Sequence, residues 1–581
     1  MSKRKTKIIL ALSSLALLAG AAGCEGRESE DSQAPIDSTK TQLYVKYYNG
    51  GLRREWLDKI CESFENDYAN YSFEEGKTGV QIVKDFEKTH VLADNVASSS
   101  YNVFVMENVD YFDFISKNAM MDITDVVQGY APIDASANET KTIESKLFAD
   151  SKSFYNVGSD SSPRYYGLPF YESSCAINYN IDLFEERGFY FAEGKTAEGM
   201  SEDDLNSYEK VGPLFVTSSS DKKSKGPDGK TGTIEGVDYS WDDGLPATYA
   251  DFHALLTYMS VDGVTPLIWN GYETGYLTSL ALSAWANSSG ADQMRNILTF
   301  SGTSTKIIDL DAKGNPKKDA DGNYVYADDL SVTAATAAQT HQQQGCLDAC
   351  NFVSTIMSNS SYYFGQGFKP SFMHTTAQNY FINGTEDATL VEKPIGMLVD
   401  GSWWNSEATE DYKGDGKKTK RFGVMPMPKP TAAQIGEDNV VVSDRDSSIF
   451  VNASTPSNLV KAAKTFVAYL NSDRSMNTFS RYTDMVRLMD YELTDETLGS
   501  MTYYGKMAYQ YFRAPSTKHL DWRPMNQSAA SKATALGYRK WGFSIDASND
   551  NPFKIFYEGK ASSGEDLFAK INKYYKTSWK A

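Results

Sequence analysis

An apolar run that ends in an acid, a glycine and two tryptophans constrains this chain more than any other stretch. Residues 395–404 read Ile-Gly-Met-Leu-Val-Asp-Gly-Ser-Trp-Trp. A run of this length, closed by glycine and small polar residues, predicts a buried strand that carries its last side chains to the edge of a sheet, where ligands bind in open α/β folds. Asp400 beside Trp403 and Trp404 suits a polyhydroxylated ring, because hydroxyls can donate to the carboxylate while an apolar face lies on an indole. The alternative, that both tryptophans are core residues, stays open at this point.

Length and charge narrow the class of protein. The 581 residues exceed one ordinary hydrophobic core, so we expect two or more lobes. The formal net charge of −19 argues against nucleic-acid binding, which needs a basic face to displace counterions.

The N-terminus has the pattern of an export signal. A basic start is followed by an apolar run from Ile8 to Leu18, which is too short to span a bilayer, and then by small residues. The small-small-Cys sequence that ends at Cys24 resembles the lipobox of bacterial lipoproteins, with Ala21 where leucine is usual. The resemblance implies that residues 1–23 are a signal peptide and that Cys24 is lipidated. Residues 24–40 are too polar to pack and are expected to form a flexible tether.

Four cysteines remain in the mature chain. Cys61, Cys175, Cys346 and Cys350 are too few to form a disulfide scaffold in a chain of this size. Cys346 and Cys350 lie four residues apart on one face of a predicted helix. They could bridge, bind a metal with His341, or lie buried as small apolar side chains, and free cysteine favours the last.

The mature chain begins as an alternating α/β domain. Residues 41–48 are β-rich and lead through a glycine turn into a helical pattern, and residues 80–83 and 101–106 predict two further strands. This alternation predicts a largely parallel sheet with polar residues at the carboxyl ends of its strands. The polar residues found there are Asn49, Glu107, Asn108 and Asp110.

Later motifs resemble one family. Residues 166–184, YGLPFYESSCAINYNIDLF, look like the segment in which carbohydrate-binding extracellular solute-binding proteins of ABC importers first cross between lobes. Residues 246–252 (PATYADF), with Thr248 as a helix N-cap, then the 395–404 strand, and then 422–428 with 447–451 follow in that family's order. Each motif is weak alone, but their shared order is specific and covers most of the chain.

The resemblance implies a fold class and a division of the chain. The fold is the two-lobe, type II periplasmic-binding-protein-like α/β fold, similar to that of maltose-binding protein, with a three-segment hinge. The crossings are expected near residues 169–173, 443–448 and 484–490. The first lobe is expected to hold residues 41–170 and 446–487, and the second lobe residues 171–445 and 488–581.

Two regions of the second lobe are longer than the family requires. Residues 221–244 are rich in glycine, lysine and aspartate, and their role stays open. Residues 306–329 contain Asp319 to Asn323, where Gly322 predicts a surface hairpin. Calcium binding there also stays open, although the spacing of an EF-hand is not met.

The resemblance also implies the ligand-binding residues. It places Asn49, Glu107, Asn108 and Asp110 on the first lobe, and Trp522 in a late segment that folds over the cleft. The residues implied on the second lobe are Trp269, Tyr272, Glu273, Asp400, Trp403 and Trp404. Trp403 is the expected stacking platform, whereas Trp404, the next residue along the chain, also remains a candidate for the core.

The implied function is that of the substrate-binding lipoprotein of an ABC transporter. Anchored through Cys24 to the extracellular face of the bacterial membrane, it would capture a sugar, expected to be an oligosaccharide, and deliver it to the permease. We expect a monomer that is not an enzyme and needs neither cofactor nor metal. No HExxH or GxSxG motif occurs, but a surface glycoside hydrolase stays open because two carboxylates brought together by folding leave no sequence pattern. A glycan-binding sensor or adhesin also stays open.

Overall fold

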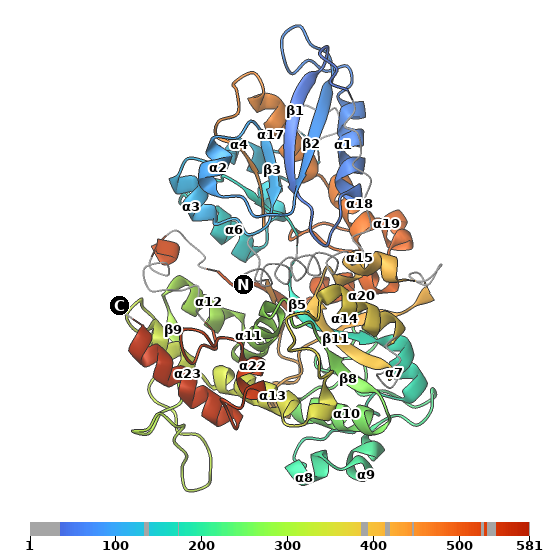
Figure 1. Ribbon diagram of the computed structural model, residues 1–581, viewed down its shortest axis with the longest axis vertical. Helices are drawn as coiled ribbons and strands as arrows, with labels where there is room; N and C mark the ends of the chain where they lie inside the picture. The colour runs from blue at the N-terminus through green and yellow to red at the C-terminus, as the bar shows by residue number, and fades with distance from the viewer. Residues whose placement is uncertain are drawn as a thin grey trace, which may run out of the picture.

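Two hydrophobic cores, each built on its own β-sheet, organise the molecule (Figure 1). The computed structural model describes residues 35–132, 139–171, 173–384, 393–412, 419–443, 447–523, 528–531 and 542–579. The first sheet lies in the upper part of Figure 1 and the second in the lower part. The expected signal peptide and Cys24 lie outside the described residues.

The first sheet has five strands in the order β2-β1-β3-β14-β4. They are β1 (Thr41–Tyr48), β2 (Val80–Glu87), β3 (Val103–Met106), β4 (Leu168–Pro169) and β14 (Ser448–Val451). The three predicted strands are confirmed, and side chains of β1 alternate between buried and half-buried. β1 runs parallel to β2 and β3, but β14 runs antiparallel to β3, because it enters this sheet from the other lobe. The expected parallel sheet is therefore limited to β2-β1-β3.

Helix α1 (Glu55–Asp67) begins after the glycine turn that follows β1. It buries Trp56, Ile60 and Phe64, which recur at helical spacing. Phe64 meets Phe466 of α17 (Val460–Leu470), and Trp56 meets Phe479 of α18 (Asp473–Thr483), both edge-on. Segments from both ends of the chain thus build the first core.

The second sheet has four strands in the order β12-β5-β11-β8. They are β5 (Cys175–Asn180), β8 (Thr265–Ile268), β11 (Ile395–Gly401) and β12 (Phe422–Met425). β11, the predicted strand, is buried at every position, runs parallel to β8 and runs antiparallel to β5. This central position explains its apolar sequence, since both of its faces are covered.

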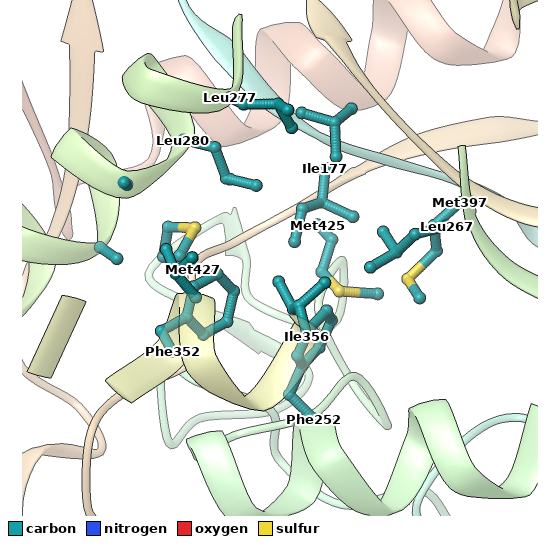
Figure 2. Packing of buried hydrophobic residues seen from close by; sticks show 14 of the residues in the cluster. Ile177, Phe252, Leu267, Leu277, Leu280, Phe352, Ile356, Met397, Met425 and Met427 are labelled. Atoms are coloured by element: carbon teal, nitrogen blue, oxygen red, sulfur yellow. The ribbon is translucent and has the colours of Figure 1, made fainter. Parts of the chain in front are cut away.

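Helices α10 (Tyr249–Val261), α11 (Gly275–Ser289) and α13 (Gln344–Met357) pack with this sheet to form the second core. Figure 2 shows their apolar side chains gathered against those of the strands. The strand residues labelled there are Ile177, Leu267, Met397 and Met425, and the labelled helix residues are Phe252, Leu277, Leu280, Phe352 and Ile356.

The chain passes between the two cores at three places. The first passage lies between Tyr171, in the first core, and Ile177, in the second. The second joins β13 (Asn439–Ser443) to β14, and its residues 444–446 lie outside the described chain. Ser174 and Ser443 pair as an antiparallel bridge, so these two passages run side by side.

The third passage touches both cores over residues 486–504. Val486 belongs to the second core, Met489, Tyr491, Leu493 and Met501 belong to the first, and Tyr504 belongs to the second again. Helix α19 (Asp495–Ser500) packs against α18 within this stretch. The expected crossing near 484–490 stays a prediction.

A fully buried guanidinium lies at the start of the first passage. Arg487 donates to the backbone oxygens of Leu470 and Pro169, both at 3.1 Å, and to the side chain of Asn471 at 2.8 Å. Burial lowers the pKa of Arg487 to about 10. Because its partners are neutral oxygens, Arg487 ties the end of α17 to the first crossing.

The two insertions form surface structure. In residues 306–329, the backbone N–H of Asp319 donates to Asn323 at 2.9 Å around Gly322, whose φ is +86°, so the predicted hairpin is confirmed. The Asp319 carboxylate accepts the backbone N–H of Asn323 and is part of the turn itself. Residues 221–244 carry a short hairpin, β6 (Thr233–Ile234) with β7 (Val237–Asp238).

The four described cysteines are buried, and none of these four forms a disulfide. Cys346 and Cys350 lie side by side in α13 as small apolar side chains, so no disulfide joins them. Within the described ranges, no group of three or more His, Cys, Asp or Glu side chains could hold a metal ion. No helix among the described residues is both long and apolar enough to cross a membrane.

The N-terminus of α10 offers a test of the fold. The Thr248 hydroxyl accepts the Asp251 N–H at 3.1 Å, and the Asp251 carboxylate accepts the Thr248 N–H at 3.0 Å, which is a complete capping box. Thr248→Ala should lower the free energy of unfolding by about 1 kcal/mol, measured by urea denaturation. Thr248→Ser keeps the hydroxyl and should stay close to the parent protein; equal losses in both variants would assign the effect to packing.

Candidate ligand-binding site

Trp403 lies where β11 ends and α15 (Trp404–Glu407) begins. Its indole is 5% exposed and meets the rings of Tyr171 and Tyr276 edge-on, with centroids 6.5 Å and 5.6 Å away. Although it follows a strand of the second sheet, Trp403 packs with the first core, as does Tyr276. Trp403 therefore sits between the two lobes.

The glycine turn after β1 lies directly against this indole. A Cβ atom placed on Gly51 would be 2.8 Å from Cδ1 of Trp403 and 3.3 Å from the carboxyl carbon of Glu407. A real Cβ does not approach that closely, so only glycine fits here while the lobes are in contact. The structure thus has the lobes meeting at Trp403.

Glu407, one helical turn after Trp403, is a carboxylate that the sequence analysis missed. Its side chain is 19% exposed, accepts a hydrogen bond from Gln378 Nε2 at 2.8 Å, and lies 3.2 Å from His374 Nε2. Both partners belong to α14 (His374–Asn383). The spacing of four residues from Trp403 was the available signal, since such residues share a helix face.

Asp400 lies buried beneath the surface and shares a hydrogen-bond donor, Gln378, with Glu407. It is fully buried and accepts hydrogen bonds from Gln378 Nε2 at 3.1 Å and from the Gly401 N–H at 2.7 Å. Burial, together with the negative charge of Glu407, raises the pKa of Asp400 to about 7. The predicted hydroxyl acceptor therefore acts through Gln378, and Glu407 is the carboxylate nearer the first lobe.

His374 completes this network, which consists of His374, Gln378, Asp400 and Glu407. Burial opposes protonation of His374, but the hydrogen bond and charge of Glu407 outweigh it, so the pKa of His374 is raised. The negative charge of Glu273 acts in the same direction, which places Glu273 in the surroundings of the network.

The first lobe contributes Glu107 and the glycine turn. Glu107 is buried and accepts a hydrogen bond from the Tyr171 hydroxyl at 2.7 Å. A Cβ atom on Gly50 would lie 3.6 Å from Glu107 Oε1. Glu107 and Glu407 thus approach the same turn from opposite lobes.

The other predicted first-lobe residues surround this turn less closely. Asn49 donates its backbone N–H to the Glu87 oxygen at 2.8 Å, and Asn108 is exposed with its amide 3.1 Å from His90. Asp110 caps α3 (Tyr111–Ser116) by accepting the Asp113 N–H at 3.2 Å. Asp110 therefore has a structural role in addition to its position near the strand end.

Two of the predicted tryptophans lie elsewhere. Trp404 is fully buried among Phe381, Phe422 and Tyr504, and it belongs to the second core. Trp269 is buried as well, because later loops cover it with Tyr363, whose ring stacks at 5.2 Å, and with Phe368. Their positions do not support a ligand-binding role for Trp404 or Trp269.

The two remaining predicted aromatic residues are more accessible. Trp522 is half-buried, lies 6.4 Å from the Trp285 ring and donates its backbone N–H to Ser443 at the second crossing. Tyr272 is 56% exposed and lies in the loop before α11, four residues before Tyr276 in sequence.

Comparisons with solved structures identify the fold. The apo form of RafE, a solute-binding protein from Streptococcus pneumoniae, is 13% identical, with a TM-score of 0.51, and the match covers 94% of this chain and 99% of RafE. A chitin oligosaccharide binding protein is 13% identical, with a TM-score of 0.50 over 93% of this chain and 99% of its own. This chain has the fold of a solute-binding protein.

The expected two-lobe, type II periplasmic-binding-protein-like fold is thereby confirmed. A structure reported for xylan utilization by the thermophilic bacterium Caldanaerobius polysaccharolyticus agrees, with 11% identity and a TM-score of 0.51 over 92% of this chain and 99% of its own. No protein-family model and no curated protein sequence matches this chain. In such a two-lobed fold, the contact of Trp403 with Gly51 lies where the lobes close on each other.

The buried Asp400 predicts a pH dependence of stability. Its pKa of about 7 in the folded protein, against 3.8 ordinarily, stabilises the fold below pH 3.8, and this contribution is lost as pH rises towards 7. The slope reaches about 1.4 kcal/mol per pH unit between these values. Asp400→Asn should therefore lose less stability than the parent between pH 5 and pH 7, measured as urea midpoints.

The exposed Asp203 provides the matched control. Asp203→Asn should keep the pH slope of the parent protein. A slope that is the same in all three proteins would contradict the protonation of Asp400.

Proposed function

We propose that this protein is the substrate-binding lipoprotein of an ABC transporter, which captures a sugar between its lobes and delivers it to a membrane permease. The observation that carries the proposal is Trp403, an indole at the end of the second sheet that packs with the first core and lies against the same glycine turn as Glu107 and Glu407. A pyranose can lay its apolar face on the indole while its hydroxyls donate to these carboxylates.

The site has the means to couple binding to closure. Trp403 and Glu407 come from the second lobe, and Gly50, Gly51 and Glu107 come from the first. A sugar that contacts both sets binds the closed arrangement more tightly than the open one, so it shifts the population towards closure. The network of His374, Gln378 and Asp400 fixes the Glu407 carboxylate before the ligand arrives, which limits the entropy lost on binding.

The related structures favour an oligosaccharide. One is named for binding chitin oligosaccharides and another for xylan utilization.

Burial of Asp400 removes the pair of Asp400 and Glu407 as candidate catalytic carboxylates. A glycoside hydrolase needs two carboxylates that both reach the scissile bond. Asp400 and Glu407 lie close enough to share Gln378 Nε2, but Asp400 is fully buried. Release of reducing ends during incubation with a bound oligosaccharide would overturn this part of the proposal.

The proposed location rests on the N-terminal sequence. Lipidation of Cys24 would hold the protein on the extracellular face of the cell membrane. Residues 24–40 are the expected tether, but Pro35, Asp37 and Thr39 at its end are hydrogen-bonded to residues 78–81 of the first lobe. Cys24→Ser should move the protein from the membrane fraction to the medium. A variant that stays with the membrane would contradict an anchor at Cys24.

The stacking platform predicts the effect of one substitution. Trp403→Ala should weaken oligosaccharide binding by about 1–3 kcal/mol, the range for a buried aromatic anchor, as measured by calorimetry with the ligand identified in a thermal-shift glycan panel. Trp579→Ala is the control and should bind normally. It removes an indole at the end of the C-terminal helix that donates a hydrogen bond to the Ala334 oxygen. If Trp403→Ala unfolds while its folded fraction binds normally, Trp403 is a core residue only.

A substitution at Gly51 tests whether the two lobes close at Trp403. The added Cβ of Gly51→Ala would clash with Trp403 only when the lobes meet, so the variant should fold normally but bind the sugar more weakly. Small-angle X-ray scattering should then show a smaller compaction on adding sugar than in the parent. Gly365→Ala places its Cβ in open space and is the control. Unchanged affinity and compaction in Gly51→Ala would contradict closure at this contact.

A further inference from the structure

Helix α6 (Ala149–Tyr155) belongs to the first lobe but also contacts the second. Phe154 and Tyr155, at its end, are members of the first core. Figure 1 shows α6 and α15 on opposite sides of the junction between the lobes, with α12 (Ala291–Thr299) of the second lobe facing α6. The lobes therefore meet at a second place besides Trp403.

An ion pair joins the lobes at this second place. Arg295 Nε of α12 donates to Asp150 Oδ1 of α6 at 2.7 Å, and the two side chains are 30% and 9% exposed. Asp292, one turn earlier in α12, accepts from Arg295 Nη1 at 2.6 Å and orients the guanidinium. Because Asp150 is nearly buried, its charge depends on Arg295 for compensation, whereas an exposed ion pair would be screened by water.

An aromatic ring of the first lobe lies beside the ion pair. Phe148, just before α6, stacks on His519 of β15 (Thr517–Asp521), with centroids 4.6 Å apart and planes 6° from parallel. The guanidinium of Arg513, at the end of α20 (Tyr503–Arg513), lies 4.9 Å from the centre of the same ring. Arg295 Nη2 donates to the His519 oxygen at 3.4 Å, so the ion pair and the stacked rings form one contact. We call Phe148, Asp150, Arg295 and His519 the α6 contact.

The other end of α6 is attached to the hinge. The Tyr155 hydroxyl donates to the Ser447 oxygen at 2.8 Å and lies 3.0 Å from Ser448 Oγ, at the second crossing. Asp150 lies five residues earlier, which is about 7.5 Å along a helix. Rotation of the lobes about the crossings therefore moves Asp150 further than Tyr155. A hydrogen bond of 2.7 Å between Asp150 and Arg295 is lost when its partners move apart by more than about 1 Å.

We propose that the α6 contact is a latch that holds the two lobes together in the absence of a sugar. It occurs in the same structure as the approach of Gly51 to Trp403, so both contacts belong to the closed arrangement. Opening of the lobes breaks the ion pair between Asp150 and Arg295. The latch raises the fraction of ligand-free protein that is closed, and the apparent affinity for a ligand of the closed form rises with that fraction.

Small-angle X-ray scattering of the full-length mature protein without ligand tests the latch. Arg295→Gln leaves the Asp150 carboxylate without its cation when the lobes are closed, so the radius of gyration should be larger than in the parent. Combining Asp150→Asn with Arg295→Gln should bring it back towards the parent value, because replacing both partners of a buried pair costs less than removing one. Equal radii of gyration in Arg295→Gln and the parent would overturn the latch.

Arg421→Gln is the matched control. Arg421 Nε donates to Asp182 Oδ1 at 2.6 Å and the Arg421 side chain is 35% exposed, but this ion pair lies within the second lobe, between the start of β12 and α7 (Ile181–Arg187). The variant should keep the radius of gyration of the parent. Expansion of the same size in Arg421→Gln would assign the effect to the loss of any ion pair and would also overturn the latch. Urea midpoints of all variants report whether they are folded.

Sugar binding gives a second measurement, which separates the latch from the proposed function. If Arg295→Gln lowers the closed fraction about tenfold, its affinity for the sugar should fall about tenfold in calorimetry. If Arg295→Gln expands the ligand-free protein and no sugar binds the parent, the latch stands and the proposed function falls. If the parent binds a sugar while Arg295→Gln has the compactness and affinity of the parent, the latch is wrong and sugar capture stands.

Discussion

The approach of Gly51 to the Trp403 indole is the contact on which the rest of the molecule depends. It brings the turn after the first strand of one sheet against the end of the central strand of the other. Those two segments are far apart in sequence, so the contact forms only when both sheets are complete and the chain has crossed between them. The absence of a side chain at Gly51 allows the approach, and the size of the indole lets one residue from the second sheet join the core of the first.

Polar groups around this contact are organised in two tiers. Glu107 and Glu407 approach the turn from opposite lobes, and behind Glu407 lie Gln378, His374 and the buried Asp400. A single amide nitrogen that donates to both Asp400 and Glu407 keeps two carboxylates close together, and the raised pKa of Asp400 follows from that closeness and from burial. The second tier sets the geometry of the first, a common way of holding binding groups rigid.

Sequence patterns predicted the parts of the structure that depend on local periodicity. Two strands were predicted correctly from such patterns: residues 41–48, which alternate, and residues 395–401, which are apolar throughout. In both, the pattern of apolar residues follows directly from which side chains are buried. Glu407 was missed because a single acid in a polar stretch resembles any surface glutamate, and its partners on α14 become neighbours only through folding. Trp269 follows strand β8, but the loop carrying Tyr363 and Phe368 covers it, and no local pattern records such a cover. The expected third crossing near 484–490 stays a prediction, because Val486 lies in the second core while Met489 and Tyr491 lie in the first.

Arg487 has a consequence for how the lobes can move. Its guanidinium holds the carbonyl oxygens of Pro169 and Leu470 together, deep in the first lobe and away from water. Separating these oxygens would leave a buried cation without its acceptors, which costs several kcal/mol. The start of the first crossing is thus clamped, and bending is confined to the chain beyond it. Arg487 thus fixes one end of the connection between the lobes. A hinge motion would bend the chain that follows Pro169.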